Sequence, residues 1–280
     1  MLGFLLIDKP PGITSHDVIY QVRRALREKR VGHAGTLDPM ATGLLVVGVN
    51  AATRLFQYLQ LEPKVYEGSI RFGIETNTQD ADGEVVNTTD AARLTIEQVR
   101  KACSKLVGET EQMPPMFSAV KVDGRPLYHL ARKGIEVERK TRTITVEKFE
   151  ILSMLNESAE FQVICSGGTY VRTLAHDVGR TLGVGAHLTR LRRTRIGNFD
   201  VSMCCTIEEI QLIPPESALQ PMPTIIVDKE TSEKIYIGQR IILPTTEKRV
   251  AVMHADSFLA ICEKEGDEYQ PVCVMPRLAC

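Results

Sequence analysis

The 280-residue sequence has no tryptophan, and aromatic residues make up only 5% of it. It has no apolar run of about eighteen residues, the length that a membrane-spanning helix needs, so no membrane protein is expected. The apolar N-terminus MLGFLLIDKPPG lacks a basic region and a cleavage site of small residues, which favours a strand over a signal peptide. With 43% hydrophobic and 25% charged residues, the composition is typical of a globular protein and excludes intrinsic disorder.

Cysteine and histidine are present without the spacings that bind metals or form a redox pair. The seven cysteines include no Cys-x-x-Cys pair, and the six histidines show no ligand spacing. We therefore expect reduced thiols, a cytoplasmic protein and no metal site. The nucleotide motifs GxGxxG and GxxxxGK and the hydrolase motifs HExxH and GxSxG are also missing. An enzyme with this sequence is expected to use no cofactor and to depend on its side chains alone.

Positive and negative residues nearly cancel over the whole chain, which has a net charge of −1. The charges are nevertheless separated along it: 19–36, 121–148 and 172–198 carry +4, +4 and +5, whereas 62–111 and 199–280 carry −4 and −6. A single basic segment is most often a solvated face. Three of them indicate a shared basic surface, and hence a nucleic-acid partner that the net charge alone argues against.

Helical and strand patterns are interspersed in the first part of the chain. Apolar spacing predicts helices at 16–28, 96–106 and 171–182 and strands at 44–49 and 66–72. Ser15 is expected to cap the first helix, and Thr95 with Gln98 has the pattern of a capping box for the second. Because the order shows no regular βαβ rhythm, we expect an α+β fold with a mixed or antiparallel sheet.

The stretch IPPESALQPMP at 213–223 holds four prolines in eleven residues and cannot continue a helix or a central strand. A domain boundary is therefore expected there. Short apolar runs separated by polar turns follow it, which predicts a small all-β module of about five strands.

The segment VGHAGTLDPMATG at 31–43 is the most unusual part of the sequence. It holds three glycines, a proline, a histidine and an aspartate, and it lies between a basic helix and an apolar strand. Such a loop can hold one carboxylate in an accurately defined position, which makes Asp38 a candidate catalytic residue. An aspartate before a proline is also typical of a turn, so this segment alone leaves both roles open.

A second segment, CSGGTYVRTL at 165–174, leads from a strand through two glycines into a helix. Arg172 lies in the first turn of that helix, where the helix dipole does not favour a positive charge. It is therefore expected to have a carboxylate or phosphate partner, although a surface arginine fits the pattern as well.

Five segments together resemble the TruB family of tRNA pseudouridine synthases. The segment GHAGTLDPMATGLL at 32–45 resembles the family's catalytic loop. The others, in the family's order, are DKPPGITS at 8–15, KVY at 64–66 with DADG at 80–83, QMPPMFSAVK at 112–121 and GTYVRTL at 168–174. The resemblance covers about residues 5–200, and its departures are small: Ala34 and Val171 replace the more common Thr and Ile.

The resemblance implies a pseudouridine synthase core, with its sheet flanked by helices, and a small C-terminal PUA-like β-barrel. It divides the chain into a catalytic domain at 1–222, with a basic tRNA-contacting insertion at about 112–142, and a PUA-like RNA-binding module at 223–280. The implied reaction converts uridine to pseudouridine in the T loop of tRNA (position 55 of the tRNA) without a cofactor or metal. The implied partner is the T stem-loop, and the protein is expected to be a monomer that binds no membrane and no small-molecule cofactor.

The same resemblance implies a role for each candidate residue. Asp38 is the nucleophile, Arg172 pairs with it, and Tyr66 stacks on the uracil and takes the proton from C5. The strand pattern around Tyr66 fits a core tyrosine equally well. His33 takes the place of the flipped-out base, while Tyr170 and Leu191 line the uracil pocket.

The residues expected to contact RNA are Lys9, Lys121, Arg125, Arg132, Lys133 and Arg142. Two other functions stay open. One is a non-catalytic tRNA-binding or tRNA-folding protein of the same fold, which a missing Asp, Tyr or Arg would favour. The other is a pseudouridine synthase that acts on another RNA, which the QMPPMFSAVK segment disfavours.

Overall fold

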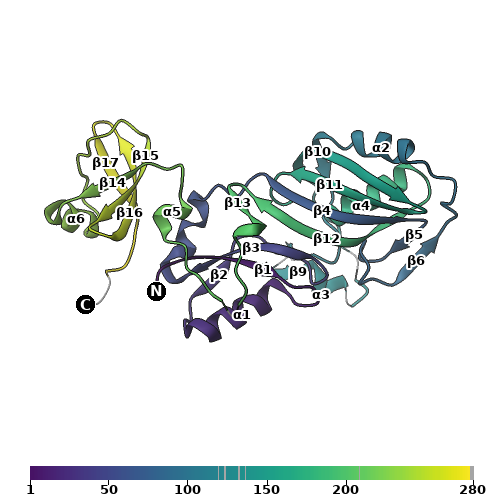
Figure 1. The fold of residues 1–280 in the computed structure, drawn as a ribbon, viewed down its shortest axis with the longest axis horizontal. Coiled ribbons are helices and arrows are strands. Elements are labelled where there is room, and N and C mark those ends of the chain that lie inside the picture. Colours follow the sequence, from purple (N-terminus) through teal and green to yellow (C-terminus); the bar gives the residue numbers. More distant parts are fainter. Residues whose placement is uncertain (119, 123, 132, 136, 208, 278–280) are drawn as a thin grey trace.

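The computed structural model describes residues 1–277 except 119, 123, 132, 136 and 208, and of residues 121, 122 and 126 it describes only the backbone. Figure 1 shows a large body built on a long sheet and a smaller body formed by the last part of the chain. The chain between them includes the short helix α5 (Pro215–Ala218), which lies in the proline-rich stretch.

The central sheet has nine strands, with a main order of β1-β3-β12-β4-β11-β10-β7, while β2 pairs with β3 and β13 with β12. The bounds are β1 (Gly3–Lys9), β2 (Val31–His33), β3 (Thr42–Val49), β4 (Lys64–Phe72), β7 (Gly108–Gln112), β10 (Arg142–Leu155), β11 (Ser158–Cys165), β12 (Ala186–Ile196) and β13 (Phe199–Asp200). Strands β12 and β3 are parallel, and the other pairs of this sheet are antiparallel. The expected α+β fold with a mixed sheet is therefore confirmed.

Helices α2 (Ile96–Ser104) and α4 (Val171–Thr181) cover one face of the sheet (Figure 1). Their apolar residues share one core cluster with inward-facing residues of β4, β10, β11 and β12. The capping box of Thr95 and Gln98 is present, as expected, and Gly183 follows the end of α4 with a positive φ. The core thus fixes α4 on the sheet, with Tyr170 just before the helix and Arg172 in its first turn.

Helix α1 (Ser15–Leu26) packs on β1 and β3 through Val18, Ile19 and Val22. Its cap differs from the sequence prediction, because the capping residue is Thr14 and not Ser15. The Thr14 hydroxyl accepts from the backbone N–H of Asp17, and the Asp17 carboxylate accepts from that of Thr14. The capping box therefore releases the Ser15 hydroxyl for another contact, described below.

The remaining elements lie around this sheet. They are the 3₁₀ helices η1 (Asn50–Tyr58) and η2 (Val201–Met203), the hairpin of β5 (Ile74–Thr76) and β6 (Val85–Thr88), and, within the insertion, β8 (Lys121–Val122), β9 (Arg125–Pro126) and α3 (Leu127–Ala131). None of the helices in the described part of the chain combines the length and apolarity needed to cross a membrane.

The smaller body contains a four-stranded sheet in the order β14 (Thr224–Val227), β15 (Arg249–His254), β16 (Ser257–Glu265) and β17 (Glu268–Val274), together with helix α6 (Lys229–Tyr236). The prediction of about five strands was one too many. The stretch around Ile241 makes a single bridge to Tyr269 and no strand. Among the described residues the sheet stays open, so the expected closed barrel is not found.

Candidate active site

The loop between β2 and β3 carries Asp38, and neighbouring segments hold it at several points. The Ser15 hydroxyl binds both backbone groups of Leu37, accepting from its N–H at 2.8 Å and donating to its carbonyl at 3.1 Å. The carbonyl of Pro39 accepts from the N–H of Gly12 at 2.9 Å. The residues on both sides of Asp38 are therefore anchored by the segment 8–15.

Lys9 is a buried member of this anchor, with 0% exposure. Its ammonium group donates to the carbonyls of Pro10, Ile13 and Pro39 at 2.9, 2.7 and 3.1 Å. Burial lowers the pKa of Lys9 to about 8, although nearby Asp38 works in the opposite direction. The expectation that Lys9 contacts RNA is therefore corrected, because its side chain is buried and its ammonium group donates to three backbone carbonyls.

Arg193 holds the other side of the loop and is also buried. Its Nε donates to the carbonyl of Leu44 at 2.8 Å, and its Nη2 donates to that of Gly35 at 3.2 Å. Sequence reasoning missed Arg193 because it counted the whole Arg-rich run as basic surface. Strand alternation was the available signal, since Arg193 lies two residues from the apolar Leu191 and so shares its face.

Arg172 reaches the loop from the first turn of α4 and is only 5% exposed. Its Nη2 lies 3.5 Å from an Asp38 carboxylate oxygen, while its Nη1 donates to Asp80 at 3.1 Å. The structure thus brings Arg172 to Asp38, but the shorter contact is to Asp80. A third contact, from Nη2 to the carbonyl of Phe117, comes from the insertion.

Asp80 is a site residue that sequence reasoning treated only as part of a turn. Its carboxylate also accepts from the Thr78 hydroxyl and from the N–H of Asp82, so it is fixed independently of Arg172. The pairing joins residues 92 positions apart, and no local pattern could indicate it. Asp38 differs in remaining 30% exposed, so its carboxylate is the one that solvent or a ligand can reach.

The electrostatics of Asp38 reflect this crowded setting. Burial raises the pKa of Asp38 most, the Arg172 guanidinium lowers it, and the carboxylates of Asp80 and Asp82 raise it. One positive charge is therefore shared between two carboxylates. Arg172 favours the ionised form of Asp38 against the burial that raises its pKa, and it does so without being bound to Asp38 alone.

Tyr66 and Leu191 lie beside the loop in the core cluster that also includes Leu37 and Ala41. The Tyr66 ring is nearly buried, and the Arg193 guanidinium lies 5.9 Å from its centre. Burial raises the pKa of the Tyr66 hydroxyl, and Arg193 opposes that rise. Tyr66 is thus a core residue and a neighbour of Asp38 at the same time, so the two interpretations of its strand do not exclude each other.

Tyr170 and His33 complete the set. Tyr170 is the residue before α4, and its ring centre lies 4.6 Å from the guanidinium of Arg142 and 5.7 Å from that of Arg172. His33 ends β2 in a half-buried position, where burial lowers its pKa and its Nδ1 has no hydrogen-bond partner among the described residues. The lowered pKa favours the neutral form of the ring.

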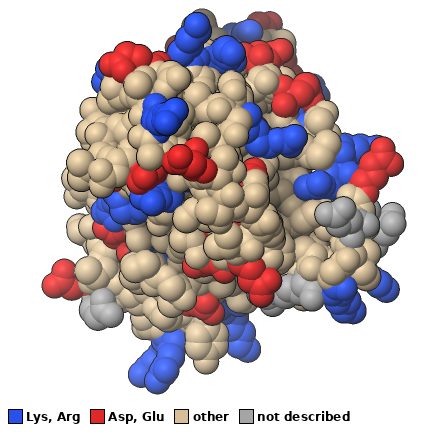
Figure 2. Space-filling model, turned by 90° about the vertical axis from the view of Figure 1, so that its right-hand side faces the viewer, with Lys and Arg blue, Asp and Glu red and all other residues tan. Residues whose placement is uncertain are grey.

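The residues expected to contact RNA are distributed unevenly. Arg125 and Lys133 are exposed, Arg142 is half-buried against Tyr170, and Arg132 and the side chain of Lys121 lie outside the described part. On the face of the molecule in Figure 2, the coloured Lys and Arg side chains alternate with Asp and Glu and form no continuous basic area. Within the described residues, no group of three or more His, Cys, Asp and Glu side chains could hold a metal ion.

This architecture is the pseudouridine synthase fold. A solved structure of an H/ACA ribonucleoprotein bound to a substrate RNA containing 2′-deoxyuridine superposes with a TM-score of 0.70 at 24% identity, covering 98% of this chain and 86% of that one. The family model for the N-terminal domain of TruB family pseudouridylate synthases matches residues 23–171, and the model for the C-terminal domain of tRNA pseudouridylate synthase B matches 172–222. The chain therefore belongs to the TruB family of pseudouridylate synthases, a family of isomerases.

Curated relatives agree over most of the chain. The tRNA pseudouridine synthase B of Syntrophotalea carbinolica is 45% identical over 261 residues, which is 90% of this chain and 84% of the relative. That of Streptococcus pyogenes serotype M2 is 40% identical over an alignment of 290 positions, which covers 98% of this chain and 99% of the relative. The resemblance indicated by the five sequence segments is thus confirmed.

Proposed function

We propose that this protein converts uridine to pseudouridine in the T loop of tRNA, with Asp38 as the nucleophile. The observation that carries the proposal is the arrangement of Asp38, Arg172 and Asp80. The partly exposed Asp38 carboxylate lies beside the buried Arg172, and Arg172 is also paired with the buried Asp80. The proposed partner is the T stem-loop of tRNA, and the protein acts as a cytoplasmic monomer without a cofactor.

The reaction rearranges bonds without gaining or losing atoms. The N1–C1′ bond breaks, the uracil rotates, a C5–C1′ bond forms, and the proton on C5 leaves as N1 gains one. Asp38 attacks the sugar or the base to form a covalent adduct, which divides the exchange into two easier steps. A carboxylate is itself a nucleophile and needs no general base, and Arg172 favours this ionised form against the burial that raises the pKa of Asp38.

Arg172 is in place before the substrate arrives. Asp80 and the carbonyl of Phe117 hold its guanidinium, so no side-chain reorganisation is needed at the moment of reaction. Because Asp80 also pairs with Arg172, the Asp38 carboxylate is not neutralised by the guanidinium alone. That arrangement suits a nucleophile better than a closed one-to-one ion pair does.

The surrounding residues receive the base. Tyr66 stacks on the uracil and accepts the C5 proton, and Tyr170 and Leu191 form the remaining walls of the pocket. Stacking of a base on an aromatic ring contributes about 1–3 kcal/mol, which offsets much of the cost of taking a nucleotide out of its stack. His33, as a neutral planar ring, takes the position that the uracil leaves.

The rest of the chain binds the RNA outside the pocket. We assign a catalytic domain to 1–222, with a tRNA-contacting insertion at about 112–142, because the family models end at 222 and the insertion exposes Arg125 and Lys133. We assign a PUA-like RNA-binding module to 223–280, because this part has its own sheet and core cluster. Its acidic net charge restricts RNA contact to a local part of its surface.

The test is tritium release from C5 of an unmodified T stem-loop that contains [5-³H]uridine. Wild-type protein should release tritium, and Asp38→Asn should lose at least about 10³-fold in rate while its affinity for the RNA changes less than about threefold. Asp256→Asn, in an exposed turn between β15 and β16, is the matched control and should keep the wild-type rate. Wild-type protein that releases no tritium, or Asp38→Asn with more than a tenth of the wild-type rate, would contradict the proposal.

A further inference from the structure

Tyr170 has an unusual attachment to β7. The side chain of Gln112, the last residue of that strand, is almost fully buried and binds both backbone groups of Tyr170. Its Nε2 donates to the Tyr170 carbonyl at 3.0 Å, and its Oε1 accepts from the Tyr170 N–H at 2.8 Å. Two hydrogen bonds to one residue fix both its position and its orientation, and no side chain of α4 itself provides a cap there.

A second residue holds the ring of Tyr170. Arg142, the first residue of β10, lies directly opposite Gln112 in the β7–β10 ladder. Its guanidinium lies 4.6 Å from the centre of the Tyr170 ring, and its Nη2 is buried without a hydrogen-bond partner among the described residues. One strand pair therefore holds Tyr170 by its backbone from one side and by its ring from the other.

Gln112 and Arg142 are also the two ends of the insertion. The residues between them leave the sheet after Gln112 and rejoin it at Arg142. Arg139 donates to the carbonyl of Pro114 at 3.0 Å, which ties the two stems together near their bases. The carbonyl of Phe117, farther along the insertion, accepts from Arg172. The insertion is thus bonded to both site residues in the first turn of α4.

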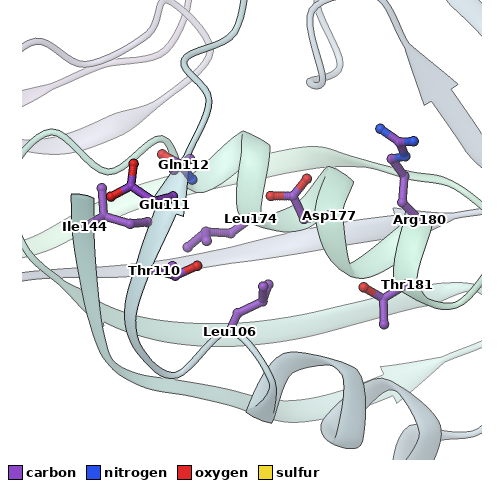
Figure 3. A pocket seen from close by; sticks show the side chains of 9 residues that line it. All are labelled: Leu106, Thr110, Glu111, Gln112, Ile144, Leu174, Asp177, Arg180 and Thr181. Carbon is purple, nitrogen blue, oxygen red and sulfur yellow. The ribbon is translucent and has the colours of Figure 1, made fainter. Parts of the chain in front are cut away.

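Away from Gln112, β7 and α4 are separated by a cavity of about 290 Å³. Figure 3 shows Gln112 at the end of this cavity near the start of the helix, with Arg180 at the other end and Asp177 between them. The two Gln112 hydrogen bonds connect the end of β7 to the residue before α4 at this end of the cavity.

We propose that Gln112 and Arg142 are positioning residues that keep Tyr170 in a fixed position relative to the insertion. The uracil pocket is thereby aligned with the RNA that the insertion binds. This assignment rests on the proposed function. Neither residue touches the reacting atoms, and both act through Tyr170 and the first turn of α4.

The first test replaces Gln112 with Met, which has a similar size but forms neither hydrogen bond. Gln112→Met should lower the single-turnover rate of tritium release about 10- to 100-fold, because a pocket wall displaced by about 1 Å costs that much, and should change RNA affinity less than about threefold. Gln211→Met, at an exposed position outside the site, should match wild type. Hydrogen exchange at 170–174 should be faster in Gln112→Met than in either.

Gln112→Glu separates positioning from folding by its pH dependence. A protonated carboxyl can still donate to the Tyr170 carbonyl, whereas a carboxylate faces that carbonyl unfavourably. The rate of the variant relative to wild type should therefore fall about tenfold or more as pH rises from about 5 to 9. Glu111, Arg142, Asp177 and Arg180 also face this region. Their own titration is common to both proteins, and their charges set only the pH at which the introduced carboxyl ionises and the ratio falls. A constant ratio would overturn the assignment.

Arg142 is tested by Arg142→Lys, which keeps the charge and loses the planar stack. We expect a rate loss about as large as that of Arg142→Gln, with little change in the salt dependence of RNA binding. A normal rate for Arg142→Lys together with a weakened affinity would make Arg142 a phosphate contact and overturn its positioning role. An inactive wild type overturns the proposed function and this assignment together, whereas an active wild type whose rate Gln112→Met leaves unchanged overturns this assignment alone.

Discussion

The candidate active site and the C-terminal module use charge in opposite ways. At the site, Arg172 and Asp80 form an ion pair whose side chains are 5% and 4% exposed. In the module, Arg240 pairs with Glu265 while the two side chains stay 53% and 48% exposed, and Arg249 pairs with Glu263 in a similar setting. Both regions contain ion pairs, but the Arg172–Asp80 pair at the site is buried, whereas these two pairs of the module are exposed to solvent.

The difference in burial shows which ion pairs reduce stability and so need a role other than stabilising the fold. Burying an ion pair costs hydration free energy that the attraction between the two charges offsets only in part. Replacing such a pair by apolar residues is therefore often neutral or stabilising. An exposed ion pair loses little hydration and contributes little to the free energy of unfolding. The charges at the site are thus retained for what they do to Asp38, and the following predictions test that contrast from its largest to its smallest expected effect.

The largest effect is expected for Arg172→Met. It leaves Asp80 buried without a counter-charge, so the free energy of unfolding should fall by about 3–5 kcal/mol. Turnover should fall at least about 10³-fold, since Asp38 loses the group that favours its ionised form. Urea unfolding and tritium release measure the two losses.

The double variant Arg172→Met with Asp80→Asn separates these losses. Neutralising Asp80 removes the uncompensated charge, so the double variant should regain much of the stability and none of the activity. If stability and activity recovered together, the buried pair would be a structural device and the contrast with the module would disappear.

Lys9→Met should have the next largest effect. It removes the donor from the carbonyls of Pro10 and Ile13, while the Pro39 carbonyl keeps the N–H of Gly12. Each unsatisfied buried group costs about 1–3 kcal/mol, so a total loss of about 3 kcal/mol is expected after relaxation. The sign of the pH dependence follows from the pKa of about 8 for folded Lys9 against 10.5 when it is unperturbed. Between these values the unfolded chain binds more protons, so wild-type stability should rise with pH relative to Lys9→Met. Urea unfolding at pH 7 and pH 10 checks this, and an advantage that shrinks at pH 10 contradicts it.

Ser15 and Lys9 show where sequence reasoning stops. The caps of α1 and α2, the helical stripe of α4 and the strand at β3 depend on neighbours a few residues away, and the sequence predicted them to within a residue or two at most ends. The Ser15 error arose because two adjacent residues can both cap a helix, and a contact to Leu37 decides between them. Lys9 was misassigned because a lysine is normally exposed, and only the three carbonyls around it reverse that expectation.

The candidate site was only partly predictable, because some of its contacts join residues far apart in the sequence. Motifs identified Asp38, Tyr66 and Arg172, and the structure brings them together. Asp80 and Gln112 contribute through contacts to residues 92 and 58 positions away, for which the sequence holds no periodic signal. The closed barrel expected for the C-terminal module came from the resemblance alone, and the described strands do not form it.

A smaller effect is expected for Asp82→Asn. The Asp82 carboxylate raises the pKa of Asp38, so its removal should lower that pKa. The proposed nucleophile must be ionised, so the rate should fall as pH drops through this pKa. The acid limb of the variant should therefore lie at lower pH than that of wild type by a fraction of a pH unit. Single-turnover rates between about pH 4 and 7 measure the limb. A limb that stays in place or moves to higher pH would contradict an effect of the Asp82 charge on Asp38.

The smallest effect is expected for Arg240→Ala in the C-terminal module. Its ion pair with Glu265 is about half-exposed on both sides, so water already solvates each charge and salt screens the pair. Removing it should lower the free energy of unfolding by less than about 1 kcal/mol and leave tritium release unchanged. Both variants remove an arginine that is paired with a carboxylate, and the two pairs differ chiefly in burial, since Arg172 and Asp80 are 5% and 4% exposed. A loss of several kcal/mol for Arg240→Ala would mean that ion pairing itself, and not burial, sets the cost, and the buried charges at the site would then need no catalytic justification.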